Sequence, residues 1–277
     1  EGLYSDKKYQ YANTDEAKKD IITELNLRVK SIREKLGDAF NIKPKAELKI
    51  QRVPQNIEAA QPGGYYNNAS LDGTRPGIYW INLRDTAEVP KWTLPTLTYH
   101  EGIPGHHLQL SIQQEVDMPL ARKLAFFSAY IEGWALYAEQ LAAEMGVYDH
   151  DKLAEIGQLQ AAMFRGVRLV VDTGMHEFKW SRERALQYYV ETLGEKEASA
   201  ITEIERYCVW PGQACSYMLG KLAILDARNR ARYKLGSKFD IRDFHDAILS
   251  AGALPLDLID EIVDSYVTDR IFKVKSG

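Results

Sequence analysis

Three histidines and a glutamate lie close together within residues 100–107 of this chain of 277 residues. They are His100, Glu101, His106 and His107, and they include half of the six histidines of the protein. Imidazole and carboxylate groups are common zinc ligands. A zinc hydrolase needs about three such ligands, an open position for water, and a base that takes a proton from that water. The segment therefore indicates a metal site with hydrolytic chemistry.

The spacing of these residues departs from the usual helical zinc motif. In His-Glu-x-x-His, two histidines four residues apart share one face of a helix, and the glutamate between them acts as the base. Here Pro104 stands at the position of the second histidine. On an unbroken helix His100 and His106 would lie ~9 Å apart along the axis, against ~6 Å in the usual motif, which is too far to chelate one ion.

Pro104 and Gly105 offer a way to restore the geometry. Proline lacks the N–H that would bond to the carbonyl of residue 100, and glycine permits almost any backbone angle. We expect a kink or bulge here that brings a later histidine beside His100. His106 is the first choice for the second ligand and His107 is the alternative, with Glu101 as general base.

The expected third ligand, Glu132, lies on the next amphipathic helix. That helix is indicated by an apolar stripe spaced alternately three and four residues apart, namely Leu124, Phe127, Ile131, Trp134, Ala138 and Leu141. Glu132 borders the stripe, and an ionised carboxylate at the edge of a core needs a cationic partner. Glu139 follows seven residues later on the same face, so we expect it to support a ligand from the second layer around the metal.

Two further groups of polar residues are candidates for the site. Arg165, Arg168, Asp172 and His176 recur at helical spacing, so Asp172 is expected to orient His176 or a metal-bound histidine. The alternative for this group is an exposed salt-bridge face.

A hydrolase also needs a donor to the developing oxyanion. Arg206, Tyr207 and Tyr217 flank the dipeptide Pro211-Gly212 and carry suitable groups. Among the tyrosines Tyr217 is preferred, because a helix that begins at Pro211 would present it from its second turn.

The elements that must position these residues are mainly helices. Apolar residues at helical spacing predict a helix over residues 14–37 and helices through most of residues 92–275. Alternating apolar and polar residues predict a small antiparallel sheet within residues 45–85. Its expected strands are residues 47–53, 63–68 and 77–83. The fold class is therefore mainly α, a single catalytic-type domain over residues 1–277 with the sheet near its N-terminal side.

Several helix boundaries are also indicated. Ser181 is expected to cap a helix that ends at Gly194, and Asp240 one that ends near Gly252. A break is expected at Pro211.

Composition limits the classes of function. The chain is 45% hydrophobic and 27% charged, with a net charge of −4, as in an ordinary folded protein. No basic stripe with interleaved aromatic residues is present, so nucleic acid is not an expected partner. No apolar run approaches the ~20 residues that a membrane helix needs. The sequence makes no prediction of an oligomeric state.

The motif at residues 100–109 (HEGIPGHHLQ) and the segment at residues 132–139 (EGWALYAE) resemble the bacterial domain-of-unknown-function 885 family. Segments at residues 168–176, 206–214 and 243–245 are similar too, and the resemblance covers most of residues 60–260.

This resemblance implies a largely helical, gluzincin-like zinc metallopeptidase that holds one Zn²⁺ per chain. The implied ligands are His100, one of His106 and His107, and Glu132, and the implied general base is Glu101. It also implies that the chain is the C-terminal, catalytic half of a longer protein. That protein would be exported, periplasmic or lipid-anchored, with any anchor outside this chain.

The expected function is hydrolysis of peptide bonds, or of a small amide, by a zinc-activated water. One alternative is a catalytically inactive domain that binds peptides as a scaffold, and another is a zinc hydrolase of a different amide or ester. In gluzincins an edge strand beside the active-site helix pairs with the extended substrate. Residues 79–83 are expected to form that edge.

Overall fold

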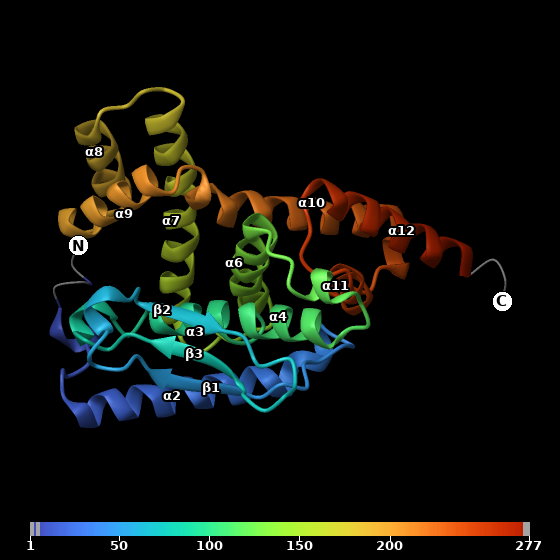
Figure 1. Ribbon diagram of the computed structural model, residues 1–277, viewed down its shortest axis with the longest axis horizontal. Helices are drawn as coiled ribbons and strands as arrows, with labels where there is room; N and C mark the ends of the chain where they lie inside the picture. Colours follow the sequence, from blue (N-terminus) through green and yellow to red (C-terminus); the bar gives the residue numbers. More distant parts are fainter. Residues whose placement is uncertain (1–2, 4–5, 274–277) are drawn as a thin grey trace.

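The computed structural model describes residue 3 and residues 6–273. A long helix, α2 (Asp15–Lys35), lies along one side of a small sheet, and the remaining helices lie mostly on the other side (Figure 1). Thr14 caps α2 by accepting a hydrogen bond from the Ala17 amide. Four apolar residues of α2 are buried, namely Ile21, Leu25, Val29 and Ile32, whereas Leu27 is exposed. The mainly helical fold class is confirmed.

The sheet has three strands close to the expected positions. They are β1 (Leu48–Arg52), β2 (Gly64–Asn67) and β3 (Gly77–Ile81). Their order is β1-β3-β2, with β3 parallel to β1 and antiparallel to β2. The sheet is therefore mixed, which corrects the expectation of a purely antiparallel sheet.

A contact distant in sequence accounts for this order. The side-chain amide of Asn82, just after β3, donates hydrogen bonds to the carbonyls of Glu58 at 2.7 Å and Gln61 at 3.0 Å. Both carbonyls belong to the connection between β1 and β2. These bonds hold the connection beside the end of β3, so that β3 lies between the other two strands.

The central place of β3 also overturns the expectation that residues 79–83 form an edge. Residues 77–81 are hydrogen-bonded to β1 on one side and to β2 on the other. Among the described residues, β2 pairs with β3 alone, so the free edge on that side of the sheet belongs to β2.

The helical part follows the expected boundaries closely. Its helices are α3 (Leu94–Glu101), α4 (His106–Glu115), α5 (Leu120–Lys123), α6 (Ser128–Glu144), α7 (Lys152–His176), α8 (Arg182–Leu193), α9 (Glu197–Val209), α10 (Ser216–Leu235), α11 (Ile241–Ser250) and α12 (Asp257–Lys273). Ser181 caps α8 and Asp240 caps α11, as expected. α8 ends at Gly194 in the left-handed conformation, with φ of 65°. No helix in the described part of the chain is long and apolar enough to cross a membrane.

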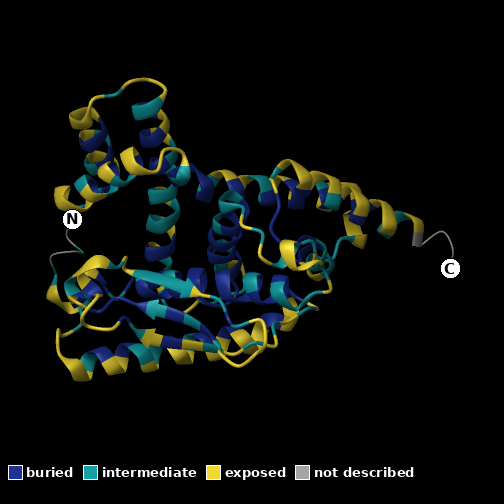
Figure 2. Cartoon of the chain, in the orientation of Figure 1, coloured by how far each residue is buried: buried dark blue, intermediate teal, exposed yellow. Residues whose placement is uncertain are grey.

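Two hydrophobic cores form on either side of the long helix α7. The larger core joins α2, the sheet, α3, α4, α6 and the C-terminal helices. The smaller core joins α7 to α8 and α9, which lie away from the sheet (Figure 1). Figure 2 shows that α6 is largely buried, whereas α2 and α12 each expose one face. The candidate residues of the site lie where α6 and α7 meet α3.

Candidate metal centre

The helical conformation is interrupted between α3 and α4, immediately after Glu101. α3 ends at Glu101 and α4 begins at His106, so the expected kink or bulge is a complete interruption of the helix. A side chain at Gly105 would collide with the His100 carbonyl, which explains the glycine. The indole N–H of Trp134 donates to the Pro104 carbonyl at 3.0 Å and so holds the interruption against α6.

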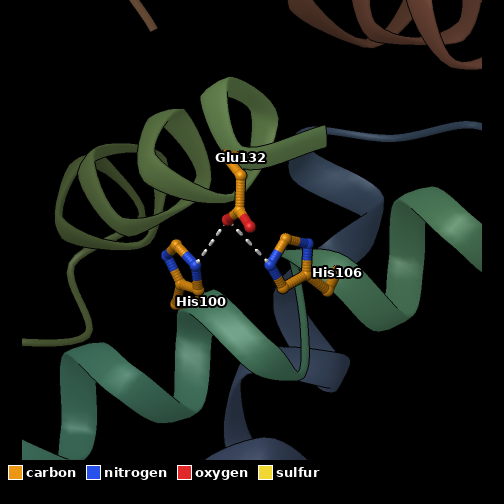
Figure 3. A group of neighbouring side chains, drawn as sticks. All are labelled: His100, His106 and Glu132. Atoms are coloured by element: carbon orange, nitrogen blue, oxygen red, sulfur yellow. Dashed lines mark ion pairs between the residues drawn. The ribbon is translucent and has the colours of Figure 1, made fainter. Parts of the chain in front are cut away.

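This interruption brings His106 back beside His100, with 4.7 Å between their ring centroids. Glu132 reaches both histidines from α6 (Figure 3). Its Oε2 atom lies 3.4 Å from the Nε2 of His100 and 3.2 Å from the Nε2 of His106. One ligand atom from each of the three residues lies within 4.8 Å of the others, so together they could hold a metal ion.

The three side chains fit a zinc ion by their chemistry and spacing. His100 is 3% exposed and His106 is 7% exposed. The buried Oε2 of Glu132 makes no hydrogen bond although two imidazole nitrogens face it. Two ligand atoms each about 2.1 Å from a tetrahedral zinc ion lie about 3.4 Å apart. The separations between Glu132 and the two histidines match that value.

The charge state of the metal-free site follows from its burial and ion pairs. Burial lowers the pKa of His100, but its contacts with Glu132 and Glu139 outweigh burial and raise that pKa to about 10. Burial raises the pKa of Glu132, and the charges of His106 and His100 more than offset it, so this pKa lies below its ordinary value. A metal ion would displace the proton from His100, because ligands bind metals in their deprotonated form.

Glu139 fixes the orientation of the His100 ring, as its place on the face of Glu132 indicates. The Nδ1–H of His100 donates to Glu139 at 2.8 Å, and the Thr96 hydroxyl donates to the other carboxylate oxygen at 2.6 Å. Nε2 of His100 is thereby left to face Glu132. Sequence reasoning missed Thr96, although it precedes His100 by four residues and so shares its helix face.

His107 lies outside the group of three. The carbonyl of Ala46 can only accept, so His107 donates to it through Nε2–H at 3.2 Å. The hydroxyl of Tyr66 then donates to Nδ1 at 3.0 Å. Burial, with the charge of Arg33, lowers the pKa of His107 to about 4, so the ring is neutral. His107 therefore positions Tyr66 of β2, a residue that sequence reasoning also missed.

A cleft of about 510 Å³ opens beside the three candidate ligands. One wall consists of β2 residues that include Tyr65 and Tyr66, and the other consists of residues of α7, α9 and α10. Glu101 lines the cleft beside His100 and is itself buried. Burial raises the pKa of Glu101, although the charges of His106 and His100 act in the opposite direction. Glu101 thus lies beside the three candidate ligands, where the sequence analysis expects a base.

Tyr217, Arg168 and Arg206 line the same cleft. Tyr217 stacks near His100, with 6.2 Å between the ring centroids. It lies in the first turn of α10 rather than the second, because Gly212, at φ of 80°, and a short 3-10 turn delay the start of that helix to Ser216. Its hydroxyl lies 3.4 Å from the Arg206 guanidinium, which can donate to it.

Other candidates do not reach the cleft. Tyr207 is fully buried in the smaller core. Asp172 accepts hydrogen bonds from the Gly212 amide at 3.1 Å and lies 3.2 Å from Nδ1 of His176. Asp172 therefore contacts His176, as expected. Among the described residues, however, the pair makes no hydrogen bond or ion pair with His100 or Glu132, and Asp172 instead supports the turn before α10.

Glu203 is a cleft residue that sequence reasoning did not single out. It accepts two hydrogen bonds from Arg168, at 2.8 and 3.1 Å, and lies 3.6 Å from Arg206. The signal for it is weak: Glu203 precedes Arg206 by three residues, a spacing that places both on one face of a helix.

Comparison with known proteins identifies one family, and the similar solved structures include two putative lipoproteins. Residues 1–263 match the family described as "Bacterial protein of unknown function (DUF885)". A crystal structure described as a "putative lipoprotein" from Colwellia psychrerythraea is 40% identical, with a TM-score of 0.94 over 97% of this chain and 46% of its own. A "putative lipoprotein of unknown function" from Shewanella oneidensis is 23% identical and shares the fold, with a TM-score of 0.77 over 88% of this chain and 45% of its own.

The chain thus spans less than half the length of these two proteins. No curated protein matches the chain.

Proposed function

The chain belongs to the DUF885 family of bacterial proteins of unknown function, and we propose that it acts as a zinc-dependent peptidase. The observation that carries this proposal is the buried oxygen of Glu132, which faces His100 and His106 and makes no hydrogen bond. Burying such a carboxylate is costly unless a cation compensates for its charge. In the metal-free site the protonated His100 compensates for part of this charge, and a divalent ion held by these three residues would replace that proton.

The catalytic roles follow from the chemistry of the cleft residues. A zinc ion in this position lowers the pKa of water and polarises a carbonyl group. Glu101 accepts the proton from the attacking water and donates it to the leaving amine. Its burial raises its pKa toward the range in which one group can perform both steps. Tyr217, with Arg206 beside its hydroxyl, stabilises the oxyanion as the carbonyl becomes tetrahedral.

The walls of the cleft support an extended substrate. β2 contributes Tyr65 and Tyr66 to one wall, and the free edge of β2 is suited to pair with a peptide backbone. We further propose that the protein works outside the cytoplasm, exported or lipid-anchored, because the similar chain from Colwellia psychrerythraea is described as a lipoprotein.

Metal analysis and turnover of three variants test the proposed function. The parent protein is expected to bind one zinc ion and to cleave members of a peptide mixture followed by mass spectrometry. Glu132→Ala and His100→Ala should lose the metal, whereas Glu101→Gln should keep it and lose turnover. His150→Ala, which changes an exposed histidine, should behave as the parent.

Full turnover by Glu101→Gln would exclude the assigned base. A parent protein that takes up no zinc would exclude the metal chemistry. Zinc uptake with tight peptide binding and no turnover in any preparation would instead favour a scaffold.

A further inference from the structure

The cleft wall formed by α7, α9 and α10 contains three arginines, and two of them make ion pairs. Arg168 makes a short ion pair with Glu203, and the same carboxylate lies 3.6 Å from Arg206. Arg206 also donates to the side-chain amide of Gln213 at 2.9 Å. One glutamate therefore serves two guanidinium groups on this wall.

The third arginine, Arg165, has no carboxylate within ion-pair distance among the residues that the structure describes. Its guanidinium donates a hydrogen bond to the Ala161 carbonyl of its own helix, at 3.4 Å. Its Nε–H is buried and makes no hydrogen bond. An arginine with a buried, unpaired donor is costly, because folding has removed water from that group without replacing it.

Aromatic rings hold the Arg165 guanidinium toward the cleft. It lies 5.0 Å from the ring centre of Phe164 and 5.7 Å from that of Tyr217. Tyr217 stacks in turn near His100, so the guanidinium lies one aromatic ring away from the candidate metal ligands.

Arg165 also stands at the junction of two cavities. It lines the cleft and a smaller side pocket of about 160 Å³, and Leu97 is likewise shared by both. Two carboxylates line the side pocket, and both have other partners. Glu139 binds His100 and Thr96, and Glu195 accepts a hydrogen bond from the Tyr189 hydroxyl at 3.2 Å. The side pocket therefore supplies no ion pair to Arg165.

The balance of charge in the cleft favours an anionic ligand. Its three arginines are matched by Glu101, Glu132 and Glu203. A divalent cation on Glu132 and the histidines would leave the cleft with a positive charge. Arginine is well suited to a carboxylate, because its planar fork can donate two parallel hydrogen bonds.

We propose that Arg165 binds a carboxylate of the substrate, so that the enzyme prefers peptides carrying a carboxylate close to the scissile bond. This inference rests on the proposed peptidase function and adds a substrate class to it. The carboxylate is either the C-terminal group of the peptide or the side chain of an acidic residue. In both cases the guanidinium anchors the substrate on the α7 side of the metal while the remaining chain lies along β2.

Equilibrium binding to the zinc-loaded Glu101→Gln protein tests this, because binding does not require turnover. Three peptides distinguish the sources of the carboxylate: acetyl-Ala-Phe-Ala, its C-terminal amide, and acetyl-Ala-Phe-Asp amide. At least one carboxylate peptide is expected to bind about 10- to 150-fold more tightly than the neutral amide, the range for a hydrogen bond to a charged group. Preference for the free acid identifies a C-terminal carboxylate, and preference for the Asp peptide identifies a side chain.

Adding Arg165→Gln to that protein should abolish the preference and leave binding of the neutral amide unchanged. Arg182→Gln, which changes an arginine of α8 that does not line the cleft, should keep the preference. If Arg165→Gln does not fold, Arg165→Lys can replace it. This variant retains the charge but loses the planar guanidinium, so it should bind carboxylate peptides with a reduced preference.

Equal binding of all three peptides, no binding of any, or a preference that survives Arg165→Gln would overturn the inference. Failure of the proposed peptidase function would look different, because the parent protein would then cleave no peptide whatever the binding pattern.

Discussion

Among single residues, His100 carries the most information about the site, because its two ring nitrogens have different partners. Nδ1–H is bound by Glu139, and Nε2 faces Glu132. A ring held in this way has one orientation, and Glu139 keeps the proton on Nδ1 when Nε2 loses its own, which would favour metal binding through Nε2. Glu139 is itself held in place by a hydrogen bond from the Thr96 hydroxyl.

Replacing Glu139 by glutamine should therefore weaken zinc binding without removing a ligand. Loss of the carboxylate that orients a metal-binding histidine typically costs about 10- to 100-fold in metal affinity. Competition with a chelating dye would measure this. Glu144→Gln, on the same helix but paired with Arg228, serves as the control. Unchanged affinity in Glu139→Gln would contradict the orienting role.

A second histidine, His245, should make stability depend on pH. Its Nδ1–H donates to the Ala39 carbonyl at 2.8 Å, and its Nε2 accepts from the Tyr137 hydroxyl at 2.7 Å. Burial lowers its pKa from 6.5 to about 3. Between these two values the unfolded chain binds a proton that the folded protein does not, so stability is complete above pH ~6.5 and falls as the pH drops.

The expected loss from His245 is about 1.4 kcal/mol per pH unit, or about 2 kcal/mol between pH 6.5 and pH 5. Urea unfolding in the presence of a chelator, at several pH values from 7 to 5, would measure it. The His245→Gln variant should show a slope smaller by about one proton. His150→Gln, at an exposed position, should keep the parent slope.

At the scale of elements, the crossing of α6 and α10 sets the distance between Glu132 and Tyr217. Gly133 and Gly220 face each other at this crossing, and a side chain at Gly220 would collide with the Ala129 carbonyl. The two backbones can approach because neither glycine carries a Cβ. Glu132 directly precedes Gly133, and Tyr217 lies three residues before Gly220, so both belong to the helix turns that meet at this crossing.

Gly220→Ala should accordingly destabilise the protein by about 1–3 kcal/mol, the usual cost of overpacking. Gly166→Ala is a matched control, because Gly166 lies inside α7 with no atom within 4 Å of the added carbon. It should be neutral or stabilising by up to about 1 kcal/mol, the helix preference of alanine over glycine. Denaturant unfolding would measure the free energy of unfolding of both variants. Equal changes in the two would show that the crossing of α6 and α10 tolerates a methyl group.

Sequence reasoning succeeded where the cause is local. Ser181 and Asp240 cap helices by bonding to amides two or three residues away, and such rules can be read from the chain. The residues that meet at the candidate metal centre were also among those expected. The order of the strands could not be read, because it depends on Asn82 bonding to residues 58 and 61. The sequence also could not show that Arg165 lacks an ion-pair partner, because this depends on how α7, α9 and α10 pack together.

At the scale of the whole molecule, the three candidate ligands come from three helices. His100 lies in the last turn of α3, His106 begins α4 and Glu132 lies in α6. All three helices belong to the larger core. An ion bound to the folded state alone would therefore stabilise that core by mass action.

Removal of zinc should lower the melting temperature. With free zinc at about 100 times its Kd, the stabilisation is about 2.7 kcal/mol, which corresponds to a shift of about 5–10 °C for a domain of this size. Calorimetry with and without a chelator would show it. His106→Ala should melt at one temperature in both conditions. A shift that persists in His106→Ala would place the ion elsewhere.

Because His106 and His107 are adjacent, the number of residues between α3 and α4 affects two parts of the site together. Neighbouring side chains on a helix point ~100° apart, so one histidine faces Glu132 while the other holds Tyr66 of β2. Inserting or deleting one residue between Glu101 and His106 would turn both rings away from their partners at once. Substitutions within residues 102–105 can be compensated one by one, but a change in the number of residues there would uncouple the cleft wall from the metal position in a single step.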